Sequence, residues 1–260
     1  MLRTPAPLSR ALGPAMRIYK YRDLSNPGTE SFERLSNIVR SNAFWCAAPS
    51  TLNDPTEFVW ECDYEPSDHT ARLLENVLID HGRNAQIARE RAMTMVKRRR
   101  IEAISRPVFE DMIEKCRREV GLACFATSGD NDVLWGRYGG EGNGVCVEIE
   151  APDELLHSCL HPVKYPASKL LHVDQLLASN SDPSLVKTVY TVALLSKPPF
   201  WAPESEVRFV SRRQNISVQI VSSYISRIIL GSDLTRDMSA MIKTFVNSLP
   251  YELPTSERGA

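Results

Sequence analysis

The chain has 260 residues, a length that fits one large domain or two small ones. Its apolar fraction of 43% and charged fraction of 24% are those of an ordinary soluble globular protein. A net charge of -1 gives no overall attraction to nucleic acid or to an anionic membrane, and no apolar run is long enough to cross a bilayer. The six cysteines lack C-x-x-C spacing and the histidines are not clustered. We therefore expect a cytoplasmic protein with reduced thiols, no contact with a membrane and no metal site.

The ends of the chain differ from its middle in composition. Residues 1–15 are rich in Pro, Ala and Leu and lack the apolar core of a signal peptide. A disordered leader over 1–16 is expected, with Met16 as an alternative start. Residues 17–249 are expected to form a single α+β domain, and residues 250–260 a flexible tail.

Apolar spacing along the chain changes repeatedly between the period of strands and that of helices. Strands are expected over 17–22, 44–48, 121–127, 145–149, 163–165, 204–210, 214–220 and 225–230. Helices are expected over 30–42, 133–138, 184–195 and 239–248, with two or three more in a helical insertion at about 67–120. Strands and helices do not alternate regularly. The pattern therefore predicts an α+β fold with a mixed or mostly antiparallel, possibly split, sheet and flanking helices.

A run of four basic residues, Lys97 to Arg100, lies in the expected insertion. From Arg89 to Arg118 there are ten Lys or Arg against five Asp or Glu. Such runs usually form the solvated face of a helix, which is the reading we favour. The alternative is a patch that contacts the phosphates of nucleic acid.

Two acidic residues stand out in the strand expected over 204–210. Glu204, Glu206 and Arg208 occupy alternate positions, so a strand would place them on one face. Two like charges repel there unless cations answer them. Arg208 can answer one carboxylate, and the other needs a ligand, a metal or a second arginine. The spacing predicts either a site or a ladder of ion pairs.

Two loops also carry polar residues. The loop from Pro49 to Glu57 holds Asn53 and Asp54 beside aromatic strands, a suitable place for function. The alternative is a turn in which Asp54 caps the backbone. The glycines of 139–144 do not form G-x-G-x-x-G and precede a strand, which excludes a Rossmann-type dinucleotide turn.

Eight segments in order from Tyr19 to Gly231 resemble a bacterial family known as a domain of unknown function. They are Tyr19-Lys-Tyr-Arg22, Leu52-Asn-Asp-Pro-Thr-Glu57, Cys124-Phe-Ala-Thr127, Leu134-Trp-Gly-Arg-Tyr138, Gly144-Val-Cys-Val-Glu148, Val163-Lys-Tyr165, Lys197 with Trp201 to Arg208, and Ile228-Ile-Leu-Gly231. Leu134 stands where the family prefers methionine, and Ala126 where it prefers serine. This resemblance implies no settled activity.

A shorter pattern resembles ADP-ribosyltransferases of the arginine-serine-glutamate type. Arg22 lies on an early strand, Thr127 and Ser128 follow a middle strand, and Glu204-Ser205-Glu206 lies on a late strand. The resemblance implies that NAD is a substrate and that ADP-ribose is transferred to an acceptor, protein or nucleic acid. It would suit a bacterial toxin or defence component.

The resemblance also implies a role for each residue. Glu206 would stabilise the positive charge that develops on the ribose carbon. Glu204 would orient or deprotonate the acceptor. Arg22 would bind a phosphate of NAD. Tyr21, Trp135 or Tyr138 could stack on nicotinamide. Asn53 and Asp54 would lie near the ribose, and Thr127 and Ser128 would also belong to the NAD-binding residues.

Three alternatives stay open. Glu204 and Glu206 could form a salt-bridge ladder with Arg208 and Arg22. A magnesium-dependent nuclease or hydrolase would use oxygen ligands, with the basic insertion holding nucleic acid; the candidate ligands are Asp54, Glu57, Glu204 and Glu206. The third alternative is a non-catalytic binding module.

Overall fold

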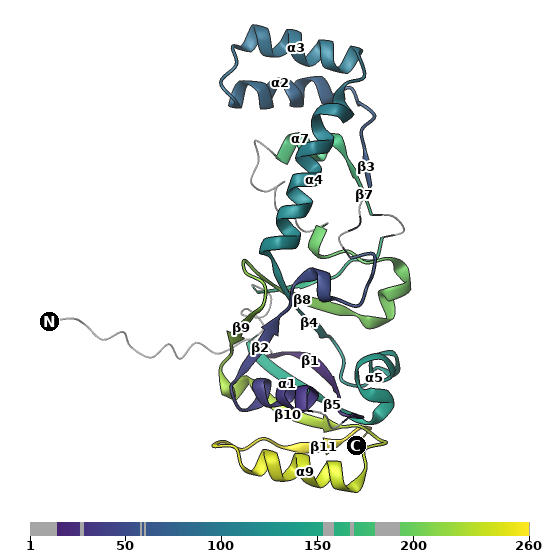
Figure 1. Ribbon diagram of the computed structural model, residues 1–260, viewed down its shortest axis with the longest axis vertical. Helices are drawn as coiled ribbons and strands as arrows, with labels where there is room; N and C mark the ends of the chain where they lie inside the picture. The colour runs from purple at the N-terminus through teal and green to yellow at the C-terminus, as the bar shows by residue number, and fades with distance from the viewer. Residues whose placement is uncertain are drawn as a thin grey trace, which may run out of the picture. The chain divides into compact units, whose positions relative to one another are not determined.

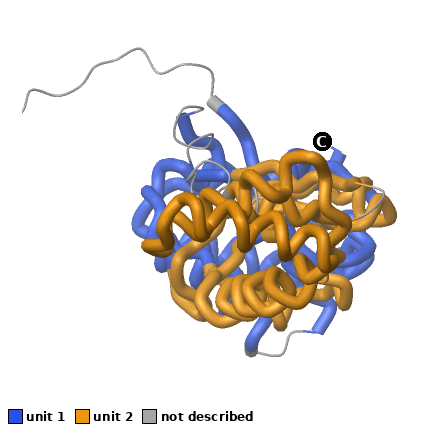
Figure 2. Tube along the Cα trace, turned by 90° about the horizontal axis from the view of Figure 1, so that it is seen from above, with its two compact units in different colours: residues 1–44, 124–160, 218–260 blue, residues 45–123, 161–217 orange. Residues whose placement is uncertain are grey.

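The computed structural model describes residues 15–26, 29–57, 59, 61–152, 159–166, 169–179 and 193–259. The chain divides into two compact units, each built from separate segments (Figure 2). Unit 1 comprises residues 1–44, 124–160 and 218–260, and unit 2 comprises residues 45–123 and 161–217. The helices expected over 67–120 belong to unit 2, together with residues 161–217.

The strands and helices confirm an α+β fold. The main sheet is mixed, mostly antiparallel, and has the order β11-β10-β5-β1-β4-β8-β6. Its strands are β1 (Ala15–Asp23), β4 (Gly121–Ala126), β5 (Gly144–Pro152), β6 (Leu160–Pro162), β8 (Glu206–Ser211), β10 (Ile225–Leu230) and β11 (Thr255–Glu257). Two smaller sheets pair β2 (Ala43–Cys46) with β9 (Ile216–Gln219), and β3 (Glu61–Asp63) with β7 (Leu170–His172).

Helices flank these strands (Figure 1). The α-helices are α1 (Thr29–Val39), α2 (Thr70–Asp80), α3 (Ala85–Lys97), α4 (Ile101–Glu119), α5 (Asp132–Tyr138), α7 (Val173–Ser179) and α9 (Arg236–Asn247). The 3-10 turns are η1 (Pro49–Thr51), η2 (Gly140–Gly142), η3 (Pro199–Glu204) and η4 (Ser222–Tyr224). Within the described part of the chain, no helix combines the length and the apolarity needed to span a membrane. The helix expected over 184–195 lies outside the described residues except for its last three positions.

Unit 1 is built on the long antiparallel pair of β1 and β5, which runs in register from Ala15↔Pro152 to Asp23↔Gly144. Because side chains alternate along β1, Tyr21 points to the face that α5 covers. Its ring meets the Trp135 ring edge to face with centroids 5.2 Å apart. The side chain of Asn131 caps α5 by accepting from the backbone N–H groups of Val133 and Leu134. These contacts make one apolar core on this face of the sheet.

The C-terminal segment is more ordered than the sequence predicts. In place of a flexible tail over 250–260, β11 pairs in parallel with β10, with Ile228 opposite Thr255. Arg258 then forms ion pairs with Asp130 and Asp132. The strand is short and polar, so its apolar pattern is too weak to signal it, and its pairing with a buried strand is what forms it.

Unit 2 contains the helices expected between 67 and 120. Phe109 and Ile113 of α4 pack in one apolar cluster with Leu171. The basic run does not form a helix face as expected, because α3 ends at Lys97 and α4 begins at Ile101. Residues 98–100 are the turn between the two helices, with Arg99 in the left-handed region at φ 50°.

Candidate functional site

The acidic segment is only partly a strand. β8 begins at Glu206, whereas Glu204 is the last residue of η3 and Ser205 has a left-handed φ of 45°. Pro198, Pro199 and Pro203 fix φ near the values of a 3-10 turn, and proline offers no N–H for a ladder. The prediction that Glu204 and Glu206 lie on one strand face is therefore wrong.

The two carboxylates nevertheless meet, because Lys197 bridges them. Glu57, Lys197, Glu204, Glu206 and Arg208 form one network in unit 2, which we call the ion-pair cluster. All five are buried, with exposed fractions between 0% for Arg208 and 9% for Glu57. Because these charged groups are removed from water, they need opposite charges and hydrogen bonds within the protein to offset the loss of hydration.

Arg208 is the centre of the ion-pair cluster. Its Nη1 and Nη2 donate to the two oxygens of Glu57 at 2.7 and 2.9 Å. Its Nε donates to Glu206 Oε1 at 2.7 Å, and Nη2 also reaches Glu206 Oε2 at 3.4 Å. Nη1 donates in addition to the Leu194 carbonyl at 2.7 Å. All the N–H groups of the guanidinium are therefore used inside the protein.

Lys197 is the second cation of the ion-pair cluster. Its Nζ lies 3.0 Å from Glu204 Oε2, 2.7 Å from Glu206 Oε2 and 4.7 Å from the centre of the Trp201 ring. Burial by itself lowers the pKa of Lys197, but Glu206 and Glu204 outweigh that effect and raise its pKa above the ordinary value of lysine. Lys197 therefore stays protonated at neutral pH.

These contacts favour the ladder of ion pairs over an open site at Glu206. The carboxylates are answered by Arg208 and Lys197, rather than by Arg208 and Arg22 as the sequence suggested. Sequence reasoning assigned Lys197 no role. A buried lysine seven residues before Glu204 gives no periodic signal, since the irregular chain between them brings the two together.

The loop between η1 and Glu57 holds two other candidates, Asn53 and Asp54. Asp54 is 3% exposed, and its Oδ1 accepts from the backbone N–H and the hydroxyl of Thr56 at 2.8 and 2.7 Å. This is the capping turn that the sequence offered as an alternative. Asp54 Oδ2 is buried without a hydrogen-bond partner. The Asn53 side chain is exposed.

Arg22 of unit 1 differs from the cations of the ion-pair cluster. It is half-buried, its Nη1 reaches only the Tyr21 carbonyl at 3.3 Å, and its Nε is buried without a partner. Within the described ranges it has no carboxylate partner. Burial, with a smaller contribution from the like charge of Arg34, lowers the pKa of Arg22 to about 10. An anion that bound beside Arg22 would stabilise its protonated form and so offset the free-energy cost of burying the charge.

The aromatic candidates of unit 1 divide by exposure. Tyr21 and Trp135 are 5% and 1% exposed, and their polar atoms donate to the carbonyls of Ser128 and Gly129. They fill the core, whereas Tyr138 is half-buried and packs against that core. Thr127 is exposed, and Ser128 is half-buried with its hydroxyl accepting from the Asp130 N–H.

The candidates thus fall into two groups. Unit 1 carries Arg22, Tyr21, Thr127, Ser128, Trp135 and Tyr138, and unit 2 carries Asn53, Asp54, Glu204 and Glu206. The convergence of Arg22 with Glu206 stays a prediction. Among the described residues, no group of three or more His, Cys, Asp or Glu side chains is placed to hold a metal ion.

Comparison with protein-family models, with curated proteins and with solved structures found no match for this chain. The resemblance to the domain of unknown function and the weaker one to ADP-ribosyltransferases therefore stay predictions. What can be argued about function comes from the side chains and their surroundings.

Proposed function

We propose that the protein binds NAD, with Arg22 holding the pyrophosphate, and that it transfers ADP-ribose to an acceptor. The observation that carries the proposal is that the guanidinium of Arg22 has no counter-charge among the described residues. Arg22 is half-buried, and its buried Nε has no hydrogen-bond partner. A guanidinium recognises phosphate oxygens through two parallel hydrogen bonds, which would satisfy this group.

The reaction makes specific demands on the carboxylates. The bond between nicotinamide and ribose breaks, nicotinamide leaves with the electron pair, and the ribose carbon bonds to the acceptor nucleophile, which loses its proton. In this proposal Glu206 supplies fixed negative charge toward the developing cation. Glu204, held by Lys197 at 3.0 Å, would help to take the proton of the acceptor.

A second candidate function is a binding module that recognises the same phosphate ligand without catalysis. The burial of Glu206 favours it, because both oxygens of this carboxylate are engaged by Arg208 and Lys197. Two adjacent cations weaken the field that Glu206 can present to a substrate. The two candidates share the binding step and differ only in turnover.

The binding step is tested by titrating purified protein with NAD and with ADP-ribose in a calorimeter. Arg22→Gln should weaken binding about 10-fold or more, since a hydrogen bond to a charged group contributes about 1.5–3 kcal/mol. The matched control is Arg17→Gln on the same strand, whose arginine is 54% exposed and paired with Glu150. This control should bind as the wild type does. If neither compound binds the wild type, both candidates are wrong.

The turnover step is tested by release of nicotinamide from NAD, with and without cell lysate as acceptor and with chelator present. Release that Glu206→Gln reduces by a factor on the order of 10² while NAD binding persists would support the transferase. Binding of NAD without any release would leave the binding module as the function.

A further inference from the structure

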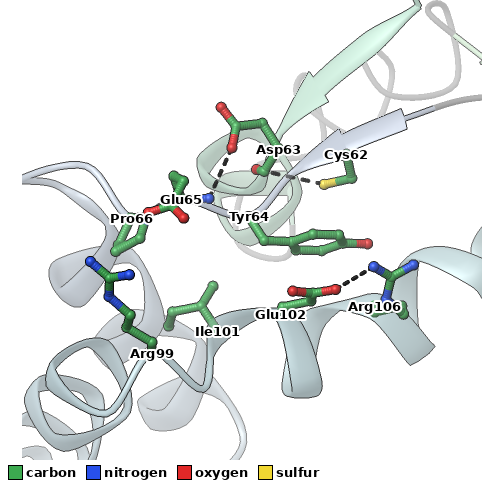
Figure 3. A pocket seen from close by; sticks show the side chains of 9 residues that line it. All are labelled: Cys62, Asp63, Tyr64, Glu65, Pro66, Arg99, Ile101, Glu102 and Arg106. Carbon is green, nitrogen blue, oxygen red and sulfur yellow. Dashed lines mark hydrogen bonds and ion pairs between the residues drawn. The ribbon is translucent and has the colours of Figure 1, made fainter.

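A pocket of about 420 Å³ lies in unit 2 between the segment after β3 and the start of α4 (Figure 3). Its lining includes Tyr64, Pro66, Arg99, Ile101, Glu102 and Arg106. Its size lies in the range of pockets for small organic groups. None of these residues belongs to the ion-pair cluster or to the candidates for NAD binding, so the pocket is a separate feature.

The basic turn of Lys97, Arg98, Arg99 and Arg100 adjoins this pocket through Arg99. All four side chains are exposed, and in the described part of the chain none of the four has an ion-pair partner. Arg100 takes the N-cap position of α4 without a capping bond from its side chain. Four adjacent cations without counter-charges raise the local positive potential and favour a polyanion.

The acidic residues of the pocket do not cancel this charge. Glu102 is paired with Arg106 across one helical turn. Asp63 Oδ1 accepts from the backbone N–H of Glu65 at 2.9 Å. Glu65 also lines the pocket, so five cations, Lys97 to Arg100 and Arg106, stand against the three carboxylates of Asp63, Glu65 and Glu102, which leaves the turn and the pocket together with excess positive charge.

The lining of the pocket suits a flat ring. The Tyr64 ring lies alongside the paired Glu102 and Arg106, with Arg106 Cζ 5.2 Å from the ring centre (Figure 3). Pro66 and Ile101 add apolar surface. An aromatic ring, an arginine and apolar walls are the surroundings in which proteins hold an unstacked base.

We propose that the basic turn and the pocket bind single-stranded nucleic acid, with residues 97–100 on successive phosphates and one base in the pocket beside Tyr64. Single strands are favoured over duplexes because a base must leave its stack to enter a pocket. The proposal does not depend on the NAD-binding function.

The phosphate contacts are tested by the salt dependence of binding, measured as fluorescence anisotropy of labelled 12-nucleotide RNA and DNA strands. For four contacts at about 0.7 each in the log–log slope, wild-type affinity should fall about 50-fold between roughly 50 and 200 mM salt. Arg98→Ala with Arg99→Gly removes two contacts, so the fall should shrink to about 7-fold. Glycine is chosen at 99 because it accepts the left-handed backbone.

The matched control is Arg117→Ala with Arg118→Ala on α4, which removes the same charge from arginines that lie 3.8 and 3.9 Å from Glu114. Its salt slope should equal that of the wild type. Equal losses in the two double variants, or no binding by the wild type at the lowest salt, would overturn the proposal. Circular dichroism of each variant checks that α3 and α4 persist.

The base pocket is tested at Tyr64. Tyr64→Leu should weaken oligonucleotide binding about fivefold or more, whereas Tyr64→Phe keeps the ring and should bind as the wild type does. Inorganic polyphosphate should bind the wild type and Tyr64→Leu equally. Preferential binding of vesicles rich in phosphatidylserine over oligonucleotides would assign the turn to a membrane surface and overturn the proposal.

Discussion

Replacing Glu206 by glutamine separates a structural ion-pair cluster from a strained active-site carboxylate. Glu206 contacts both cations, with Arg208 Nε and Lys197 Nζ each 2.7 Å from its oxygens. Glu204 contacts Lys197 Nζ, at 3.0 Å. Glutamine keeps the shape of the side chain but removes its charge. Its single amide oxygen can face one of the two cations, so its N–H₂ group must face the other, which is unfavourable.

The magnitude follows from this geometry. A close pair at an effective dielectric constant of about 20 interacts by about 4 kcal/mol, and Glu206 makes two such contacts. The variant no longer has to desolvate the Glu206 charge, which offsets much of that sum. We expect Glu206→Gln to lose about 2–4 kcal/mol of unfolding free energy, slightly less than the cost of about 3–5 kcal/mol for breaking a buried pair, because glutamine still offers a hydrogen-bond acceptor.

Glu204→Gln should cost about 1 kcal/mol or less, because two effects partly cancel. It loses one contact to Lys197. It also removes negative charge from a cluster in which Glu57, Glu204 and Glu206 face Lys197 and Arg208, so that opposite charges become equal in number. The ranking of the two variants, rather than either value alone, is the structural prediction.

The assay is thermal and urea unfolding followed by circular dichroism, with both variants measured in parallel with the wild type. For a chain of this size, about 1 kcal/mol corresponds to about 2–4 °C, so Glu206→Gln should melt about 4–16 °C lower. A Glu206→Gln protein as stable as the wild type, or more stable, would refute the structural reading. It would then favour strained catalytic carboxylates.

Three further predictions follow from single groups. Arg22→Met should stabilise the protein by about 1–2 kcal/mol, because it removes a buried charge that has no counter-charge among the described residues and whose pKa burial lowers to about 10; lower thermal stability would contradict this. Burial raises the pKa of Tyr64 to about 12, so the stability that its protonated hydroxyl gives the folded protein is complete below pH 10 and is lost as the pH rises from 10 to 12. Tyr64→Phe should therefore flatten the pH dependence of the melting temperature between pH 10 and 12. Asp54→Asn keeps the bond acceptor for Thr56 but removes the charge from an unpartnered oxygen, so a melt should show a gain of about 0.5–1 kcal/mol, and a loss would contradict it.

Periodic elements could be predicted from the sequence, and irregular ones could not. The strands β1 and β5 were predicted from their apolar and aromatic residues, and helices between 67 and 120 were predicted from their apolar stripes, although α4 continues through Pro107, where the sequence suggested a break. The strand predicted at Glu204 does not form, because three prolines hold the backbone before it in a 3-10 turn, where residues two apart do not share a face. A local backbone constraint therefore outweighs a side-chain pattern.

The partners of the charged residues were the least predictable part of the site. Glu57 lies 151 positions from Arg208, yet their side chains form a pair with two parallel hydrogen bonds. No spacing rule connects such residues, because the sheet and the loop after η1 bring them together. The aromatic candidates Tyr21 and Trp135 show the converse: residue type suggested a ligand, while burial assigns them to the core.

Arg208 of unit 2 and Arg22 of unit 1 differ in whether their charge is paired inside the protein. Arg208 has every N–H engaged and no exposed surface, so any ligand there would first have to break bonds to Glu57 or Glu206. Arg22 carries the cost of burial without a counter-charge in the described ranges, so a phosphate there would form bonds and break none with a carboxylate. Because binding energy comes from the difference between the free and the bound states, the unanswered arginine is the stronger candidate for ligand binding. Arg208, whose N–H groups are all engaged, then belongs to the framework of unit 2.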